Sequence, residues 1–97
     1  MSISFTQTII SRLKREMAEL EKQSLDEKKA RDKAQAKLKQ LQKDSKRSQL
    51  PSDLSSKLTR INKLNEAIAE INKKQIHLSK LLVSKREELN QQIAKSR

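Results

Sequence analysis

The chain of 97 residues contains no cysteine and no glycine, and it has one aromatic side chain, Phe5, and one proline, Pro51. Without cysteine there are no disulfides and no thiolate ligands for a metal. Without glycine there is neither a phosphate-cradling loop nor the sharp turn that exposes a nucleophilic serine. Glycine and proline are the residues that most often interrupt helices, and this chain has only one of them, Pro51. The sequence therefore predicts few loops.

The residues that are present favour long helices. Charged residues make up 36% of the chain and apolar residues 33%, and the formal net charge is +11. Frequent Lys, Glu, Leu, Gln and Ala are typical of coiled coils. A high net charge with low hydrophobicity is also typical of disordered chains, but the regular spacing of the apolar residues argues against disorder.

Two heptad patterns flank Pro51. In the first pattern, position a is occupied by Ile3, Ile10, Met17, Ser24, Arg31 and Leu38. Position d is occupied by Thr6, Leu13, Leu20, Glu27, Ala34 and Leu41. The second contains Ile61, Leu64, Ile68, Ile71, Gln75, Leu78, Leu82, Lys85 and Leu89. Apolar residues that alternate at spacings of three and four over several heptads predict a coiled coil.

The sequence thus predicts an all-α fold, an antiparallel two-helix coiled-coil hairpin in a single domain of residues 1–97. The helices are expected at about residues 4–46 and 52–95, with a turn at about 47–51, because a residue before proline is disfavoured in a helix. Ser4 and Ser52 are the expected N-caps, with Asp53 near the positive end of the second helix dipole. Numbers of facing residues should add to about 100.

Polar residues interrupt the seam near its middle. Ser24 and Glu27 are expected level with Gln75, which makes one polar layer. Such a layer often fixes the register of a coiled coil at some cost in stability. The alternative is that these side chains extend to solvent along the helix surface.

More apolar residues are present at the end with both termini than two helical stripes can cover. They are Phe5, Ile9, Leu25, Ile76, Leu81, Val83 and Ile93. Exposed apolar patches usually mark interaction surfaces, and a two-helix unit is a small core. We therefore expect self-association, with two hairpins forming a homodimeric four-helix bundle. The alternative is a monomer with scattered apolar residues on its surface.

Positive charge is concentrated around the turn, where residues 33–63 contribute +7 of the total. Candidate anion contacts are Lys39, Lys43, Lys46, Arg47, Lys57, Arg60 and Lys63. One interpretation is a basic coiled-coil arm that binds nucleic acid through phosphates. The other is an ordinary solvated face, since no aromatic residue is available to stack bases and no base-reading motif is present.

No residue pattern indicates catalysis, a cofactor, a metal or a small-molecule ligand. His77 has Lys73, Lys74 and Lys80 at neighbouring helical positions, so we interpret it as a solvated side chain. The start of the chain does not resemble a signal peptide, and no apolar run reaches membrane-spanning length. We expect a cytoplasmic protein that does not bind membranes.

Short segments distributed over most of the chain resemble the N-terminal coiled-coil region of certain bacterial TIR-domain proteins. They are Met1–Phe5, Leu54–Leu58 with Arg60 and Ile61, Lys73–Gln75, and Leu78–Lys80. In that family the helical region assembles subunits, and a C-terminal TIR domain cleaves NAD. The resemblance implies that these residues are the assembly portion of a longer protein. We thus expect a non-catalytic oligomerisation and scaffolding module.

Overall fold

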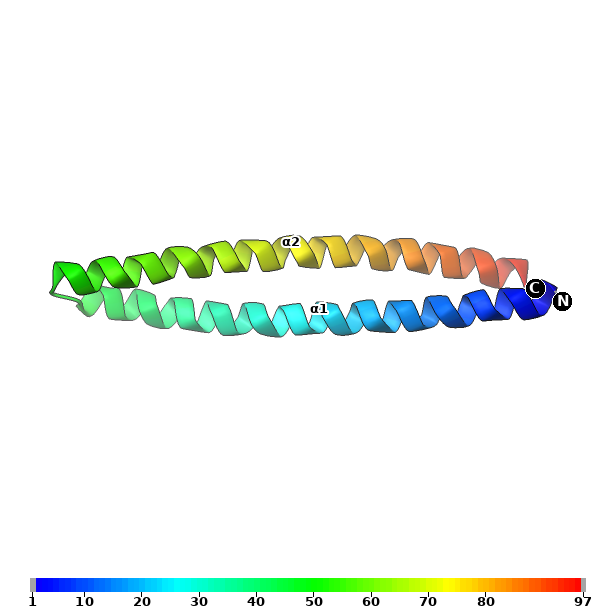
Figure 1. Ribbon diagram of the computed structural model, residues 1–97, viewed down its shortest axis with the longest axis horizontal. Coiled ribbons are helices and arrows are strands. Elements are labelled where there is room, and N and C mark those ends of the chain that lie inside the picture. Colours follow the sequence, from blue (N-terminus) through cyan, green and yellow to red (C-terminus); the bar gives the residue numbers. More distant parts are fainter. Residues whose placement is uncertain (1, 97) are drawn as a thin grey trace. The chain divides into compact units, whose positions relative to one another are not determined.

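The structure is a computed structural model that describes residues 2–96, with side chains described from Phe5 onward. Two long helices, α1 (Ser2–Arg47) and α2 (Pro51–Lys95), account for nearly all of it (Figure 1). Residues 2–96 contain no strand. The predicted helical hairpin is confirmed: one break at the only proline separates two helices of similar length.

The hairpin divides into two compact units, each with a segment of both helices. The terminal unit comprises residues 1–26 and 75–97, and the turn unit comprises residues 27–74. In the terminal unit the first half of α1 lies beside the last half of α2, and in the turn unit the remaining halves lie side by side (Figure 1).

The predicted seams coincide with the less exposed side chains. Every predicted seam position from Thr6 onward is buried or half-buried; the side chain of Ile3 lies outside the described residues. Three side chains with described positions are buried, namely Ile10, Leu13 and Leu78, and all belong to the terminal unit. Two helices cover only one stripe of each other, so most of the remaining seam is half-buried.

Contacts between the helices fix the antiparallel register. Lys85 Nζ lies 2.7 Å from Glu16 Oε2 in the terminal unit, and Lys74 Nζ lies 3.8 Å from Glu27 Oε1 in the turn unit. Lys57 Nζ donates to the Asp44 carbonyl oxygen over 3.4 Å. The residue numbers in each pair add to 101, in agreement with the expected value of about 100.

Two predicted helix caps need correction. Helix α1 begins at Ser2, so Ser4 lies within its first turn rather than before it; the Ser4 side chain is outside the described residues. Helix α2 begins at Pro51, so Ser52 is its second residue and not its cap. Proline suits the first helical position because its fixed φ is already helical and an N–H is not needed there. Asp53 lies in the first turn, as expected.

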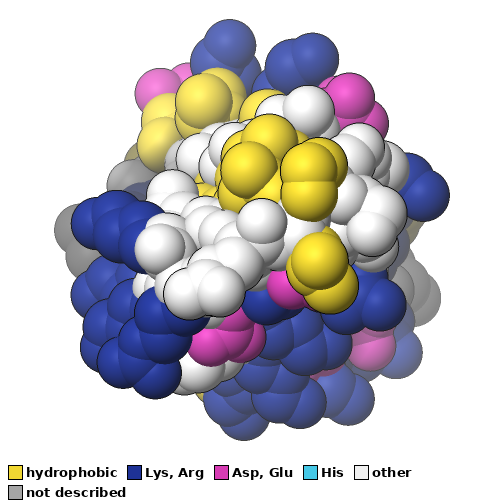
Figure 2. All heavy atoms as spheres, turned by 90° about the vertical axis from the view of Figure 1, so that its left-hand side faces the viewer, with side chains coloured by type: hydrophobic (Ala, Val, Ile, Leu, Met, Phe, Trp, Pro, Cys, Tyr) yellow, Lys and Arg dark blue, Asp and Glu magenta, His cyan; other side chains and the backbone are white. Residues whose placement is uncertain are grey.

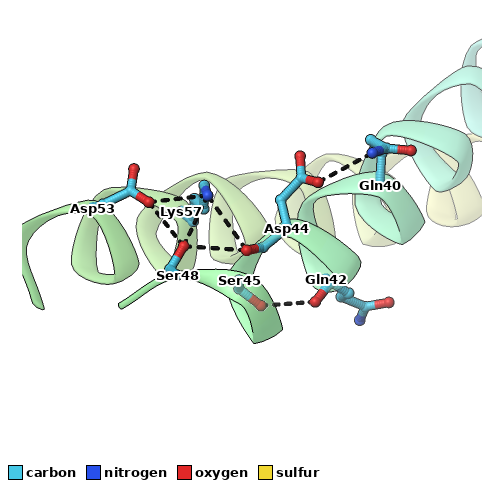
Figure 3. A network of polar contacts seen from close by, with 7 residues as sticks. All are labelled: Gln40, Gln42, Asp44, Ser45, Ser48, Asp53 and Lys57. Carbon is cyan, nitrogen blue, oxygen red and sulfur yellow. Dashed lines mark hydrogen bonds and ion pairs between the residues drawn. The ribbon is translucent and has the colours of Figure 1, made fainter. Parts of the chain in front are cut away.

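The turn between the helices is closed by side chains (Figure 3). Helices commonly end with a glycine at positive φ, but no residue in the described part of this chain has positive φ. Lys57 Nζ contacts three acceptors: the Asp44 carbonyl oxygen at 3.4 Å, Ser48 Oγ at 2.8 Å and Asp53 Oδ2 at 3.0 Å. The first of these is one of the last four carbonyls of α1, which lack helical partners. The Lys57 ammonium therefore caps α1 and ties it to α2.

Candidate functional site

The side chains predicted to mediate self-association all belong to the terminal unit. Four of them are exposed: Phe5 by 69%, Leu25 by 51%, Ile76 by 58% and Val83 by 54%. The other three, Ile9, Leu81 and Ile93, are half-buried and already contribute to the hairpin itself. The exposed four are thus the ones that a partner would have to cover.

Three of these exposed side chains share one flank of the terminal unit. Leu25, Ile76 and Val83 each follow a seam position directly, which is heptad position b. In an antiparallel pair, the b positions of both helices lie on the same side of the seam. The register also places Leu25 level with Ile76. We call these three residues the aliphatic patch; Phe5 is at position c, on the opposite flank.

An ion pair connects the two helices within the terminal unit. Lys85 is a half-buried seam residue, and its Nζ donates to Glu16 Oε2 at 2.7 Å; Arg12 Nε lies 3.1 Å from the other carboxylate oxygen. The hydrogen bond from Lys85 and the positive charges of Lys85 and Arg12 lower the pKa of Glu16. A carboxylate held ionised in this way stabilises the register and is poorly suited to general acid catalysis.

The turn unit carries most of the positive charge. Its residues 27–74 include 14 Lys or Arg and 6 Asp or Glu, a net charge of +8, against +3 for the terminal unit. Of the predicted anion contacts, Lys39, Lys43, Lys46, Arg47, Arg60 and Lys63 are exposed. The seventh, Lys57, has only 23% of its side chain exposed and uses its ammonium within the turn.

Some of the basic side chains surround a shallow groove. The groove has a volume of about 450 Å³, and its lining residues are Lys37, Gln40 and Leu41 of α1 and Arg60, Lys63 and Leu64 of α2. Leu41 and Leu64 are half-buried seam residues and form the floor, whereas the three cations are exposed. The sequence analysis identified Arg60 and Lys63 as anion contacts but did not foresee the groove.

A second apolar cluster was missed by the sequence analysis. Leu50, Leu54 and Leu58 are exposed and recur every four residues from the turn into α2. Leu54 lies one heptad before Ile61, so the heptad pattern could have revealed it. The register places Leu54 level with Arg47, so Leu54 has no apolar partner on α1. The view onto the turn shows apolar side chains gathered at the tip among many Lys and Arg side chains (Figure 2).

The described part of the chain has no group of residues suited to hold a metal ion. His77 is exposed, as expected, and residues 2–96 contain no group of His, Asp or Glu that could hold a metal ion. In the same residues, neither helix has an apolar stretch long enough to cross a membrane. Ser24, Glu27 and Gln75, the residues of the predicted polar layer, are each half-buried, and Glu27 pairs with Lys74.

Comparison of the chain with protein-family models, with curated proteins and with solved structures found no match. The resemblance to the coiled-coil region of bacterial TIR-domain proteins therefore stays a prediction. The two surfaces described above, the aliphatic patch of the terminal unit and the cationic groove of the turn unit, are the features from which a function can be argued.

Proposed function

We propose that this chain is a non-catalytic self-association module, and that the terminal unit of one hairpin packs against that of a second copy to form a four-helix bundle. The observation that carries the proposal is the aliphatic patch: Leu25, Ile76 and Val83 are each more than half exposed on one flank. The charge distribution supports the choice of unit. The terminal unit has a net charge of +3 and the turn unit +8, so two terminal units repel each other less.

Hydrophobic burial supplies the driving force. Removing apolar surface from water stabilises an association by roughly 25 cal/mol per Å². A two-helix pair buries few side chains, and only three are buried in the described part. Packing a second pair of helices against the first encloses the half-buried residues as well. Forming a four-helix bundle therefore buries more apolar surface than covering the aliphatic patch alone would.

The experiment replaces Ile76 and Val83 by Glu in one chain. Both side chains are exposed in the hairpin, so the hairpin should still fold, whereas burying unpaired carboxylates in the interface costs several kcal/mol. We expect the double variant to sediment as a monomer at concentrations at which the unmodified chain is a dimer. A dimer that persists in the variant would refute the role of the patch.

A matched control keeps the charge change and moves it to the other flank. Ser84 and Gln91 are exposed residues of α2 at position c, and Ser84→Glu with Gln91→Glu changes the net charge by the same amount. This control should leave the dimer intact. Loss of the dimer in both variants would mean that charge alone, rather than the aliphatic patch, controls association.

The family resemblance suggests what this assembly would serve. We propose that the module brings together copies of a C-terminal effector domain in the cytoplasm, in the manner of the helical region of bacterial TIR-domain proteins. Helix α2 ends in the terminal unit, and this supports the proposal because association there would bring domains attached after α2 close together. Expression with the downstream coding sequence, followed by an NAD-cleavage assay, tests it independently of the dimer.

A further inference from the structure

We propose that the groove of the turn unit binds an acidic amphipathic helix of a partner protein. In this arrangement the partner lays apolar side chains on Leu41 and Leu64 and directs carboxylates toward Lys37, Arg60 and Lys63. This interaction is separate from self-association, which uses the terminal unit.

The first support is the chemistry of the rim. Lys37, Arg60 and Lys63 are exposed side chains from both helices, and no carboxylate lines the groove with them. None of the three makes an ion pair within the described part of the chain. Three like charges around one groove repel each other, so an anionic ligand gains from all of them together.

The acid nearest in sequence to the α1 side of the groove is already engaged. Asp44 lies one turn beyond Gln40, and its carboxylate accepts a hydrogen bond from Gln40 Nε2 over 3.1 Å (Figure 3). The other carboxylate near the turn, Asp53, pairs with Lys57 at 3.0 Å. Neither carboxylate makes an ion pair with Lys37, Arg60 or Lys63 among the described residues.

The second support is the unfinished packing of the turn unit. No described side chain in residues 27–74 is fully buried, and its seam leucines and isoleucines are only half-buried. The groove exposes part of this seam at Leu41 and Leu64. A third helix laid along the flank would bury these side chains, as occurs when amphipathic helices bind hydrophobic grooves.

The groove combines apolar side chains at its base with cations around it, and this combination favours some anionic ligands over others. Nucleic acid would satisfy the rim but leaves the leucine floor unused, and the only aromatic residue, Phe5, lies in the terminal unit, so bases have nothing to stack on. A second copy of the turn unit carries +8 as well and would be repelled. An acidic amphipathic helix complements both the floor and the rim.

The test measures binding of a labelled peptide to the full chain. The probe is a fluorescein-labelled helix of about three heptads with Leu at positions a and d and Glu at e and g. Fluorescence anisotropy is measured at about 50 mM salt, where screening is weak. We expect saturable binding of this probe, and none of a peptide in which Lys replaces every Glu.

Two charge-reversed variants distinguish binding in the groove from non-specific attraction of the acidic peptide to the positive net charge of the chain. Lys37→Glu with Lys63→Glu reverses two cations of the rim, and Lys39→Glu with Lys46→Glu makes the same charge change at exposed sites outside it. We expect the rim variant to lose at least about tenfold in affinity and the control less than about threefold, because like charges at close range are strongly unfavourable.

Three outcomes would overturn the proposal. The first is an equal loss in both variants, which would show attraction to net charge only. The second is tighter binding of duplex DNA or structured RNA than of the acidic peptide in the same assay. The third is no peptide binding at all. Circular dichroism verifies that each variant keeps its helical content; if the rim variant does not, Lys37→Gln with Lys63→Gln replaces it, with the same expected direction.

Discussion

Lys57 shows how much one side chain can contribute in a chain without glycine. Its ammonium has three N–H groups and contacts three acceptors, and two of these, the Asp44 carbonyl oxygen and Ser48 Oγ, come from the α1 side of the turn. The Ser48 hydroxyl, with one hydrogen to donate, lies 2.8 Å from Asp53 Oδ2 and 3.1 Å from the Asp44 carbonyl oxygen. These contacts replace the backbone cap that glycine usually provides.

The same contacts predict how the turn responds to acid. Hydrogen bonds from Lys57 and then Ser48 lower the pKa of Asp53 below its ordinary value of 3.8. Since the pKa is lower in the folded chain, the stabilisation by this carboxylate is complete above about pH 3.8 and is lost as the pH falls through the folded value. Melting temperatures measured from neutral pH to below pH 3 should therefore depend less on pH in Asp53→Asn than in the unmodified chain.

A titration followed by NMR locates the effect at Asp53 itself. In the unmodified chain the carboxyl carbon of Asp53 should titrate with a pKa below 3.8. In Lys57→Met, which keeps most of the aliphatic stem but removes the ammonium, the pKa should rise toward 3.8 because the principal hydrogen bond is gone. An unchanged midpoint in Lys57→Met would contradict the network.

At the scale of the helices, the heptad pattern and Pro51 were sufficient to predict two helices, their seams and their register. These features are local or periodic in the sequence, and they directly predict that each helix buries one apolar stripe. The cap formed by Lys57 and the groove depend instead on side chains brought together from both helices. Their sequence separation gives no periodic signal, which is why sequence analysis placed Lys57 among the solvent-facing anion contacts.

The start of α2 was mispredicted for a different reason. Ser52 has the side chain of a good N-cap, which predicted a helix beginning there, but proline prefers the first helical position. In the structure Pro51 begins the helix, and the Leu54 amide already donates to the Leu50 carbonyl oxygen at 3.0 Å. Pro51 sets the start of α2 because the residue before a proline is disfavoured in a helix, so the preceding helix has to end before Pro51.

The antiparallel pairing within the turn unit can be tested with a disulfide. Leu41 and Ile61 are facing half-buried seam residues in this unit, and the chain has no native cysteine. Leu41→Cys with Ile61→Cys should form a disulfide within one chain under mild oxidation, seen as faster migration in a non-reducing gel. Crosslinking only between chains would mean that helices from different copies pair with each other.

At the scale of the whole molecule, the two units differ in the interactions that their surfaces favour. The terminal unit has the aliphatic patch and the three buried residues among those described, whereas the turn unit has most of the positive charge and the cationic groove. Association through one unit therefore leaves the other available. This separation allows the two proposals to fail independently, because the variants that test one lie outside the unit that carries the other.

Sedimentation equilibrium of the unmodified chain tests the central claim most directly. The chain has a mass of 11.2 kDa, and a self-associating module should approach twice that mass as its concentration rises. The dimer should also persist at high salt, where screening weakens charge–charge contacts but leaves hydrophobic burial intact. A mass that stays at 11.2 kDa over the whole concentration range would contradict the proposed function.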